Sequence, residues 1–151
     1  SVERLMRRGI YKGPLVMNWV AIGGGMDAPS IYSLANFVRA VPDGAVLTVE
    51  SSVLNVLPVN MMGIAMGLHV RCGTEDNLWN QRRTAKMGTV AQIEQLVRIA
   101  GEFGRPIATA QQAREICRIG QFYGTVDETL AANGFAPNRN GAQQGFLRKA
   151  A

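Results

Sequence analysis

The sequence is poor in the residues that usually hold metals or cross-link a chain. Its 151 residues include a single histidine, His69, and two cysteines, Cys72 and Cys117. The cysteines show neither C-x-x-C nor zinc-finger spacing, so we predict neither a disulfide framework nor a four-ligand structural metal site. Both are interpreted as reduced packing residues.

Long apolar runs and a leader-like start are also missing. No apolar run reaches the roughly 18 residues that a membrane span needs. Residues 1–4, SVER, lack the basic start and apolar stretch of a signal peptide. We therefore expect no membrane partner and a cytoplasmic location.

Acidic residues are outnumbered, with 11 Asp and Glu against 16 Lys and Arg and a net charge of +5. A polyanionic partner would suit this balance. The basic residues are scattered, however, with no long block and few interleaved aromatic residues. This pattern argues against a nucleic-acid partner and leaves a phosphorylated cofactor open.

Hydrophobic residues are plentiful, at 47%, and their pattern alternates between strand-like and helix-like. Mostly apolar runs predict three buried strands, over residues 15–22, 45–49 and 69–73. A helix is expected after each of them, between Pro29 and Pro42, from Pro58 to Met66, and from residue 89 to residue 100. Because parallel strands need a crossover between them, this order predicts a parallel α/β sheet.

Helix starts are marked by capping boxes, T-x-x-Q or T-x-x-E, at Thr89, Thr109 and Thr125. Apolar spacing also predicts a helix at the start of the chain, within residues 2–10. The longest helix is expected to turn one apolar face inward, made of Val90, Ile93, Val97 and Ala100. About the last dozen residues are predicted to form a mobile tail.

The densest group of reactive side chains follows the third predicted strand. Arg71, Glu75 and Asp76 lie there, at the carboxyl end of the strand, which is the functional edge of a parallel α/β sheet. Glu75 has the chemistry of a metal ligand, and Asp76, held ionised by Arg71, that of a proton acceptor. On residue types alone the alternative is a salt-bridged loop in which Asp76 caps the next segment.

Residues 67–78, GLHVRCGTEDNL, resemble the G-x-H-V-R-x-G-x-E-D-N-L signature of the beta-keto acid cleavage enzymes. Further similarities are spread in order along the chain, at residues 23–26, 41–42, 97–100, 108–109 and 113–116. The resemblance implies a zinc-dependent (β/α)₈ TIM barrel that condenses a β-keto acid with acetyl-CoA, giving acetoacetate and a new CoA thioester. It also implies a homo-oligomer, commonly a tetramer.

The family's functional residues fall on three positions of this signature. Its zinc-binding glutamate falls on Glu75, and its catalytic arginine and aspartate fall on Arg71 and Asp76. The resemblance implies that zinc polarises the keto oxygen of the substrate and that Asp76 acts as base on the keto acid. Arg71 would orient the carboxylate of that acid and balance charge.

One feature of the family is missing from the sequence. The family's zinc is also held by two histidines in an H-x-H pair, whereas this chain has only His69. A single carboxylate does not hold catalytic zinc, whose usual site has three protein ligands. His69 is interpreted as a core residue or a supporting neighbour of the site rather than a ligand. The isolated chain is expected to bind zinc weakly and to be inactive.

Three further groups are weaker candidates, each with a structural alternative. The amides of the glycines at 23–25 could hold a phosphate or simply form a tight turn. Residues 50–52, ESS, could line the pocket or be solvent-facing loop residues. Arg82, Arg83 and Lys86 could meet the phosphates of coenzyme A or form a solvated basic loop.

The α/β pattern, read with the barrel that the resemblance implies, predicts the C-terminal half of a (β/α)₈ barrel over residues 1–106, followed by a helical extension and polar tail over residues 107–151. Half a barrel has two open parallel edges that must be covered. The chain is therefore expected to be a fragment, an incomplete gene product or one subunit of a larger assembly. The predicted function in the full context is a zinc-dependent acyltransferase acting on a β-keto acid and acetyl-CoA. The alternative is a non-catalytic half-barrel that serves as an assembly module.

Overall fold

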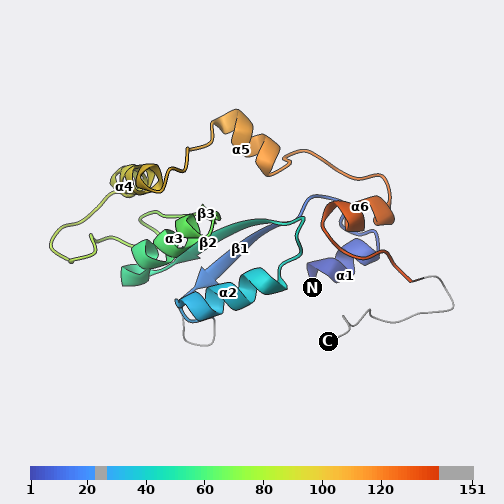
Figure 1. Cartoon of the computed structure of the whole chain (residues 1–151), viewed down its shortest axis with the longest axis horizontal. Helices are drawn as coiled ribbons and strands as arrows, with labels where there is room; N and C mark the ends of the chain where they lie inside the picture. Colours follow the sequence, from blue (N-terminus) through green and yellow to red (C-terminus); the bar gives the residue numbers. More distant parts are fainter. Residues whose placement is uncertain (23–26, 140–151) are drawn as a thin grey trace. The chain divides into compact units, whose positions relative to one another are not determined.

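The structure, a computed structural model of the chain, describes residues 1–22 and 27–139. Its elements, which except for η1 are labelled in Figure 1, are α1 Val2–Arg7, β1 Val16–Ala21, α2 Ile31–Ala40, β2 Val46–Ser51, the 3₁₀ helix η1 Val53–Asn55, α3 Val56–Ala65, β3 His69–Val70, α4 Thr89–Glu102, α5 Ala110–Ile116 and α6 Val126–Ala132. The glycines at 23–25 and the predicted tail lie outside the described residues.

The chain divides into two compact units. The sheet unit comprises Val16–Val41 and Val46–Cys117. The terminal unit comprises Ser1–Leu15, Pro42–Ala45 and the described residues from Arg118 onward.

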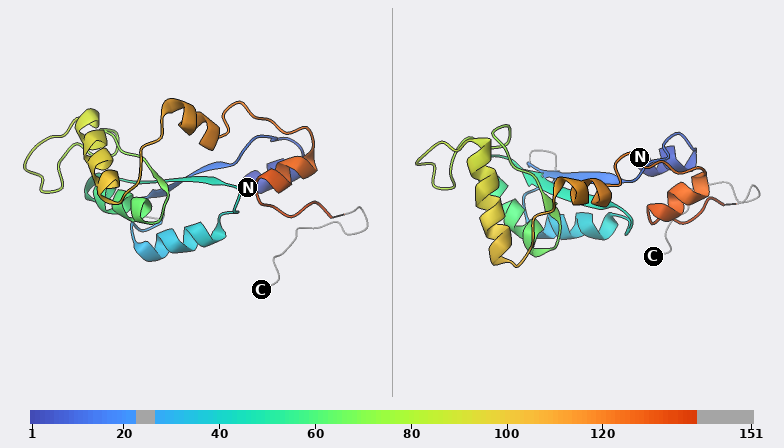
Figure 2. Two further views of the ribbon diagram at one scale, coloured as in Figure 1. Left: turned by 45° about the horizontal axis from the view of Figure 1, so that its top comes forward. Right: turned by 90° about the horizontal axis from the view of Figure 1, so that it is seen from above.

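Three parallel strands form the sheet of the sheet unit, in the order β1-β2-β3. Trp19 of β1 pairs with Val49 of β2, which in turn pairs with Val70 of β3. Figure 2 shows β1 and β2 running side by side. The predicted parallel α/β arrangement is therefore confirmed, although β3 ends at Val70 rather than Gly73. The described residues form three strands and no closed barrel. That this sheet is half of a barrel therefore stays a prediction.

One face of this sheet is covered by helices. Alternate residues of β1 and β2 point to that face, and they pack with Leu34 of α2 and Val59 of α3. Each large apolar side chain buried in this way contributes about 1.5–3 kcal/mol. The opposite face is more open, since Val16 is 50% exposed and Asn18 is also exposed. The helices of the sheet unit thus leave one side of the sheet without a matching apolar layer.

Helix α4 buries a different face from the predicted one. Its buried residues are Gln92, Leu96 and Ala100, and the last two pack with Ile64 of α3. The other three residues of the predicted inward face are exposed, namely Val90, Ile93 and Val97. The helix carries apolar residues on two adjoining sides, so their spacing alone does not show which side is buried. Contact with α3 decides it.

The capping boxes predicted at Thr109 and Thr125 are confirmed. The one predicted at Thr89 is wrong, because Gly88 is the N-cap of α4 and no side chain caps that end. Thr89 is instead the first residue of the helix, and its hydroxyl oxygen accepts a hydrogen bond from the backbone N–H of Thr74, 3.3 Å away.

Among the described residues, no helix has both the length and the apolar character to cross a membrane.

In the terminal unit, a buried asparagine ties the segment after α1 to α6. Asn133 is fully buried. Its side-chain oxygen accepts from the N–H of Leu15 at 2.6 Å, and its amide donates to the carbonyls of Gly13 and Thr129 at 3.1 and 2.8 Å. A buried amide whose hydrogen bonds are satisfied in this way stabilises the unit, whereas an unsatisfied one would cost about 1–3 kcal/mol.

Gly63 allows α3 to lie close against the sheet. A Cβ at this position would overlap Cγ2 of Val49 and would lie 3.0 Å from Cγ1 of Val70. We expect Gly63→Ala to lower the free energy of unfolding by about 1–3 kcal/mol, the usual effect of overpacking a core. Gly101→Ala in α4, where a Cβ would meet nothing within 4 Å, should raise it by about 0.5–1 kcal/mol. Urea denaturation followed by circular dichroism measures both, and a neutral or stabilising Gly63→Ala would contradict the close packing of α3.

Candidate active site at the carboxyl end of β3

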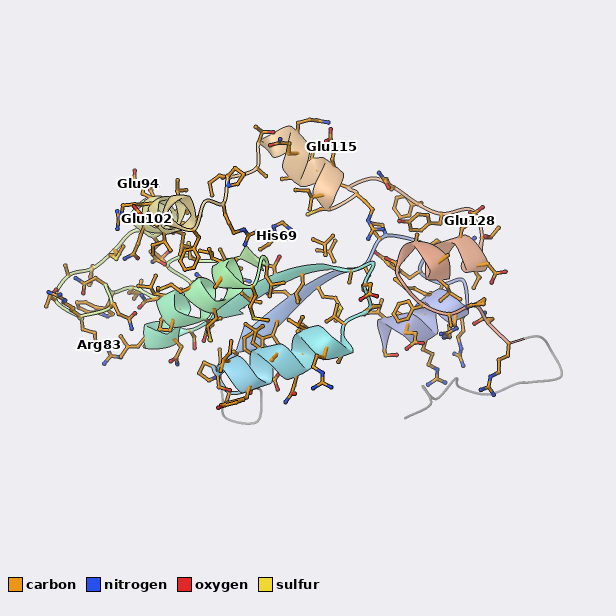
Figure 3. All side chains as sticks on the ribbon, viewed as in Figure 1. His69, Arg83, Glu94, Glu102, Glu115 and Glu128 are labelled. Carbon is orange, nitrogen blue, oxygen red and sulfur yellow. The ribbon has the colours of Figure 1, made fainter. Side chains whose placement is uncertain are left out.

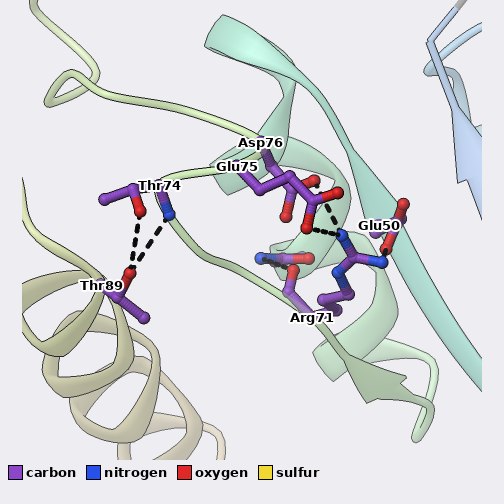
Figure 4. Close-up of polar contacts among 7 residues, drawn as sticks. Glu50, Arg71, Thr74, Glu75, Asp76 and Thr89 are labelled. Carbon is purple, nitrogen blue, oxygen red and sulfur yellow. Dashed lines mark hydrogen bonds and ion pairs between the residues drawn. The ribbon is translucent and has the colours of Figure 1, made fainter.

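The chain turns back on itself directly after β3. Arg71 donates its backbone N–H to the carbonyl of Val49 at 3.0 Å, which continues the pairing with β2 by one residue. The carbonyl of Gly73 then accepts from the N–H of Asp76 at 3.1 Å and closes a turn. This turn brings the side chains of Glu75 and Asp76 back toward Arg71 (Figure 4).

Buried side chains from two helices hold this turn in place. Asn60 of α3 donates to the carbonyl of Arg71 at 3.0 Å. Gln92 of α4 donates to the carbonyl of Asn77 at 2.7 Å. Both amides are buried, so core packing sets their positions and they in turn set the position of the backbone.

The guanidinium group of Arg71 contacts three carboxylates (Figure 4). Its Nη1 lies 2.7 Å from Oε2 of Glu50, and its Nη2 lies 2.9 Å from Oε2 of Glu75 and 3.3 Å from Oδ1 of Asp76. We call these four residues the charged cluster. One positive and three negative charges give it a formal charge of −2 when all groups are ionised. Such an excess favours the uptake of a proton or a cation.

Glu50 is the member of the charged cluster that the sequence left undecided. Val49 pairs with Val70, so the next positions along the two strands place Glu50 beside Arg71. The side chain of Glu50 is only 8% exposed. The solvent-facing alternative is therefore wrong for Glu50, and also for Ser51, which is 1% exposed. A known strand register would have identified this pair, because neighbours across a sheet follow from register alone.

Asp76 is the most unusual carboxyl of the charged cluster. Burial raises its pKa above the ordinary value, the guanidinium of Arg71 lowers it, and the carboxylates of Glu50 and Glu75 raise it further, so that the net direction is upward. Arg71 does favour the ionised form, as expected, but burial outweighs it. The side chain is 10% exposed, and Oδ2 has no hydrogen-bond partner among the described residues. A carboxyl with these properties is a better proton acceptor than a surface aspartate.

Glu75 lies at the rim of the charged cluster, with its side chain 83% exposed. Within residues 1–22 and 27–139, no three His, Cys, Asp or Glu side chains gather in a way that could hold a metal ion. His69 is exposed, so its interpretation as a core residue is wrong, because it lies on β3, an edge strand of the described sheet. The residues present do not fit a complete zinc site. Glu75 offers one carboxylate, which it shares with Arg71.

Both cysteines, Cys72 and Cys117, are free thiols. Cys72 packs beside Ile64 and Leu96. Burial, and to a lesser degree the charge of Asp76, raises the pKa of the Cys72 thiol. A neutral thiol is a weak nucleophile and a good packing group, which agrees with the predicted role of Cys72.

Comparison with known proteins places this geometry in a family. The family model for the beta-keto acid cleavage enzyme matches residues 1–119, a stretch that includes the whole charged cluster. The chain belongs to this family. The signature at residues 67–78 thus identified the family correctly.

Two curated relatives are 3-keto-5-aminohexanoate cleavage enzymes. The enzyme of Acetoanaerobium sticklandii is 35% identical over 117 residues, which are 77% of this chain and 42% of the relative. The enzyme of Fusobacterium nucleatum is 32% identical over 113 residues, which are 75% of this chain and 41% of the relative. The chain therefore spans about two fifths of the length of these members of the family.

A shorter match is to the 3-oxoadipate:acetyl-CoA acetyltransferase of Cupriavidus necator. It is 36% identical over 53 residues, which are 35% of this chain and 19% of the relative. The name of this relative includes acetyl-CoA as a substrate.

Replacing Glu50 tests the electrostatics of the charged cluster. Because Glu50 raises the pKa of Asp76, we expect Glu50→Gln to lower that pKa. The loss of a competing carboxylate also strengthens the pull of Arg71 on Asp76 in the same direction. An NMR titration of the Asp76 side-chain carboxyl measures the shift, with Glu94→Gln on the exposed surface of α4 as the matched control. An unchanged or higher pKa in Glu50→Gln would show that Glu50 does not act on Asp76.

Proposed function

We propose that the charged cluster is part of the active site of an enzyme that condenses a β-keto acid with acetyl-CoA, giving acetoacetate and a new CoA thioester. One observation carries this proposal. The side chain of Asp76 is 10% exposed and its pKa is raised, its Oδ2 has no hydrogen-bond partner within residues 1–22 and 27–139, and its Oδ1 lies 3.3 Å from a guanidinium group whose side chain is 40% exposed. The names of the relatives, a keto-acid cleavage enzyme and an acetyl-CoA acetyltransferase, support it.

In this proposal Asp76 is the base. The carboxylate of Asp76 takes a proton from the β-keto acid, and this changes the formal charge of the cluster from −2 to −1. Glu50 and Glu75 repel the ionised form of Asp76 and raise its pKa. The same repulsion therefore favours the transfer of the proton to Asp76.

Arg71 orients the substrate by its carboxylate. A guanidinium group can grip a carboxylate with two parallel hydrogen bonds, and the exposed part of Arg71 is open to such a ligand. Three carboxylates already contact Arg71, so a fourth would meet excess negative charge unless a proton or a cation is present. This need supports the proposal that Glu75 is one ligand of the family's zinc, completed by ligands that the described residues do not provide.

We further propose that residues 1–106 form the second half of a (β/α)₈ barrel and residues 107–151 its C-terminal extension. In a barrel the helices cover only the outer face of the sheet, and the inner face packs on side chains from other strands. The one-sided cover of the sheet by α2 and α3 supports this arrangement. The position of the charged cluster after β3 does so too, because active sites of barrels lie at the carboxyl ends of strands. A cytoplasmic location and a homo-oligomeric state, which the family resemblance suggests is a tetramer, stay predictions.

Glu75→Gln tests the metal part of the proposal. We expect this variant of the complete enzyme to lose zinc and activity together, each by at least about tenfold, because a neutral amide is a poor replacement for an anionic ligand. The measurements are zinc content by elemental analysis and CoA-thioester formation from a β-keto acid and acetyl-CoA. Glu94→Gln, on the exposed surface of α4, should change neither.

The two adjacent acids have different expected behaviour, which allows the assignment to be overturned. Asp76→Asn should keep the metal that Glu75→Gln loses. Loss of zinc in Asp76→Asn with normal zinc in Glu75→Gln would mean that the roles of the two carboxylates are reversed. Absence of thioester formation in the unaltered complete enzyme would favour the non-catalytic assembly module.

A further inference from the structure

A loop rich in positive charge follows the charged cluster along the chain. This basic hairpin, residues 78–87, carries Arg82, Arg83 and Lys86, all of them exposed. The chain has no acidic residue between position 76 and Glu94. None of the three cations forms an ion pair with a described residue. In Figure 3, Arg83 lies on this loop between β3 and α4. The hairpin therefore presents positive charge that the sheet unit does not neutralise.

The basic hairpin is held in one shape by its own side chains. Asn80 accepts from the N–H of Thr84 at 2.9 Å and donates to the hydroxyl of the same residue at 2.8 Å. Trp79 and Lys86 pair across the hairpin, and Nζ of Lys86 lies 5.8 Å from the centroid of the Trp79 ring. Arg83 has a φ of +56°, a left-handed conformation that costs a non-glycine residue about 1–2 kcal/mol. The hydrogen bonds of Asn80 and the pairing of Trp79 with Lys86 hold the three cations at defined positions.

The basic hairpin and the charged cluster rest on neighbouring residues of one segment. The side chain of Gln81 donates to the carbonyl of Leu54 at 2.9 Å. The backbone N–H of Val53 donates to the carbonyl of Asp76 at 2.8 Å. Val53 and Leu54 are adjacent residues of η1. The basic hairpin and the charged cluster therefore lie side by side in space as well as in the sequence.

The basic hairpin and the charged cluster have opposite charge, so they suit different parts of a ligand. The charged cluster has a formal charge of −2 and would repel the phosphate groups of coenzyme A. Arg82, Arg83 and Lys86 have the opposite sign, and arginine in particular forms strong charge-assisted hydrogen bonds to phosphate. A polyanionic thioester could therefore be held by its phosphates at the hairpin while its acetyl end reaches the cluster.

We propose that the basic hairpin binds the phosphate groups of acetyl-CoA. The identity of this ligand rests on the proposed function, whereas the anion site itself rests on the charges and the shape of the hairpin. Arg82 and Arg83 donate hydrogen bonds to phosphate oxygens, and Lys86, held over Trp79, adds its charge. The site takes free phosphate or pyrophosphate weakly and coenzyme A more tightly.

Isothermal titration of the purified chain with coenzyme A tests this inference. The double variant R82Q/R83Q should bind coenzyme A about tenfold more weakly than the unaltered chain, and its affinity should depend less on salt. R98Q is the matched control, since Arg98 is an exposed arginine of α4 outside the hairpin, and its affinity should be unchanged. Pyrophosphate should compete with coenzyme A on the unaltered chain. Circular dichroism and the thermal midpoint, Tm, establish that the variants are folded.

Three results would overturn the inference. The first is no detectable binding of coenzyme A by the unaltered chain. The second is equal affinity in the unaltered chain and R82Q/R83Q. The third is an equal loss in R98Q, which would mean that net charge and not the hairpin attracts the ligand. Failure of the proposed function is distinct, because it would leave the affinity pattern intact while the complete enzyme forms no CoA thioester.

Discussion

Asp76→Asn in the complete enzyme is expected to lower kcat for CoA-thioester formation by about 10²–10⁴-fold, the usual contribution of a general base. An amide has the shape of the carboxyl group but cannot take the proton. The rate at which a β-keto acid and acetyl-CoA give a thioester measures this directly. Asp127→Asn makes the same chemical change at an exposed position of α6 and should leave the rate unchanged.

Stability measurements separate this loss of activity from unfolding. The pKa of Asp76 is raised in the folded chain. Its contribution to stability is therefore fully present below the unfolded pKa and is lost as the pH rises through the folded pKa. Asparagine has no such titration, so Asp76→Asn should be at least as stable as the unaltered chain at neutral pH. Full activity in Asp76→Asn would remove Asp76 from the role of base.

Arg71→Lys is expected to lower kcat/KM by about 10²-fold, while the fold remains intact. Lysine keeps the positive charge but does not reproduce the two-pronged grip of a guanidinium group on a carboxylate. It also cannot contact Glu50, Glu75 and Asp76 in the geometry that Nη1 and Nη2 of Arg71 allow. Steady-state kinetics of the complete enzyme at several concentrations of the keto acid give the measurement.

Arg71→Met removes the charge as well and should affect folding. It leaves the largely buried carboxylates of Glu50 and Asp76 without their common cation. We expect the free energy of unfolding to fall by about 1–3 kcal/mol, less than for a fully buried ion pair, because the side chain of Arg71 is 40% exposed. Urea denaturation of the chain measures this. Arg98→Met, at an exposed position of α4, is the control. Unchanged stability in Arg71→Met would show that water or protonation already compensates these carboxylates.

Much of the sheet unit could be predicted from local patterns. The strands at residues 15–22 and 45–49 were placed within one or two residues of β1 and β2, because a buried parallel strand appears as a continuous apolar run. The capping boxes at Thr109 and Thr125 were also correct, since a cap depends on residues only three positions apart.

Predictions that depended on a distant partner were less successful. Apolar spacing predicts an inward face of α4 made of Val90, Ile93, Val97 and Ala100. Contact with α3 instead buries Gln92, Leu96 and Ala100, so that only Ala100 is shared. The end of the third strand was also placed too late, because the hydrogen bonds that fold the chain back after Arg71 follow from turn geometry and not from apolar character.

The sequence by itself determined which chemical groups are available and in which family they belong. Residues 67–78 carry the family signature, and the order Arg71, Glu75 and Asp76 within it needs no structure to be recognised. Tertiary structure decided how these groups act on one another. Glu50 lies 2.7 Å from Arg71 because β2 and β3 are aligned in one register, and the pKa of Asp76 is raised because the folded chain buries its side chain. Register and burial arise from contacts between residues that are far apart in the chain, and no local pattern contains them.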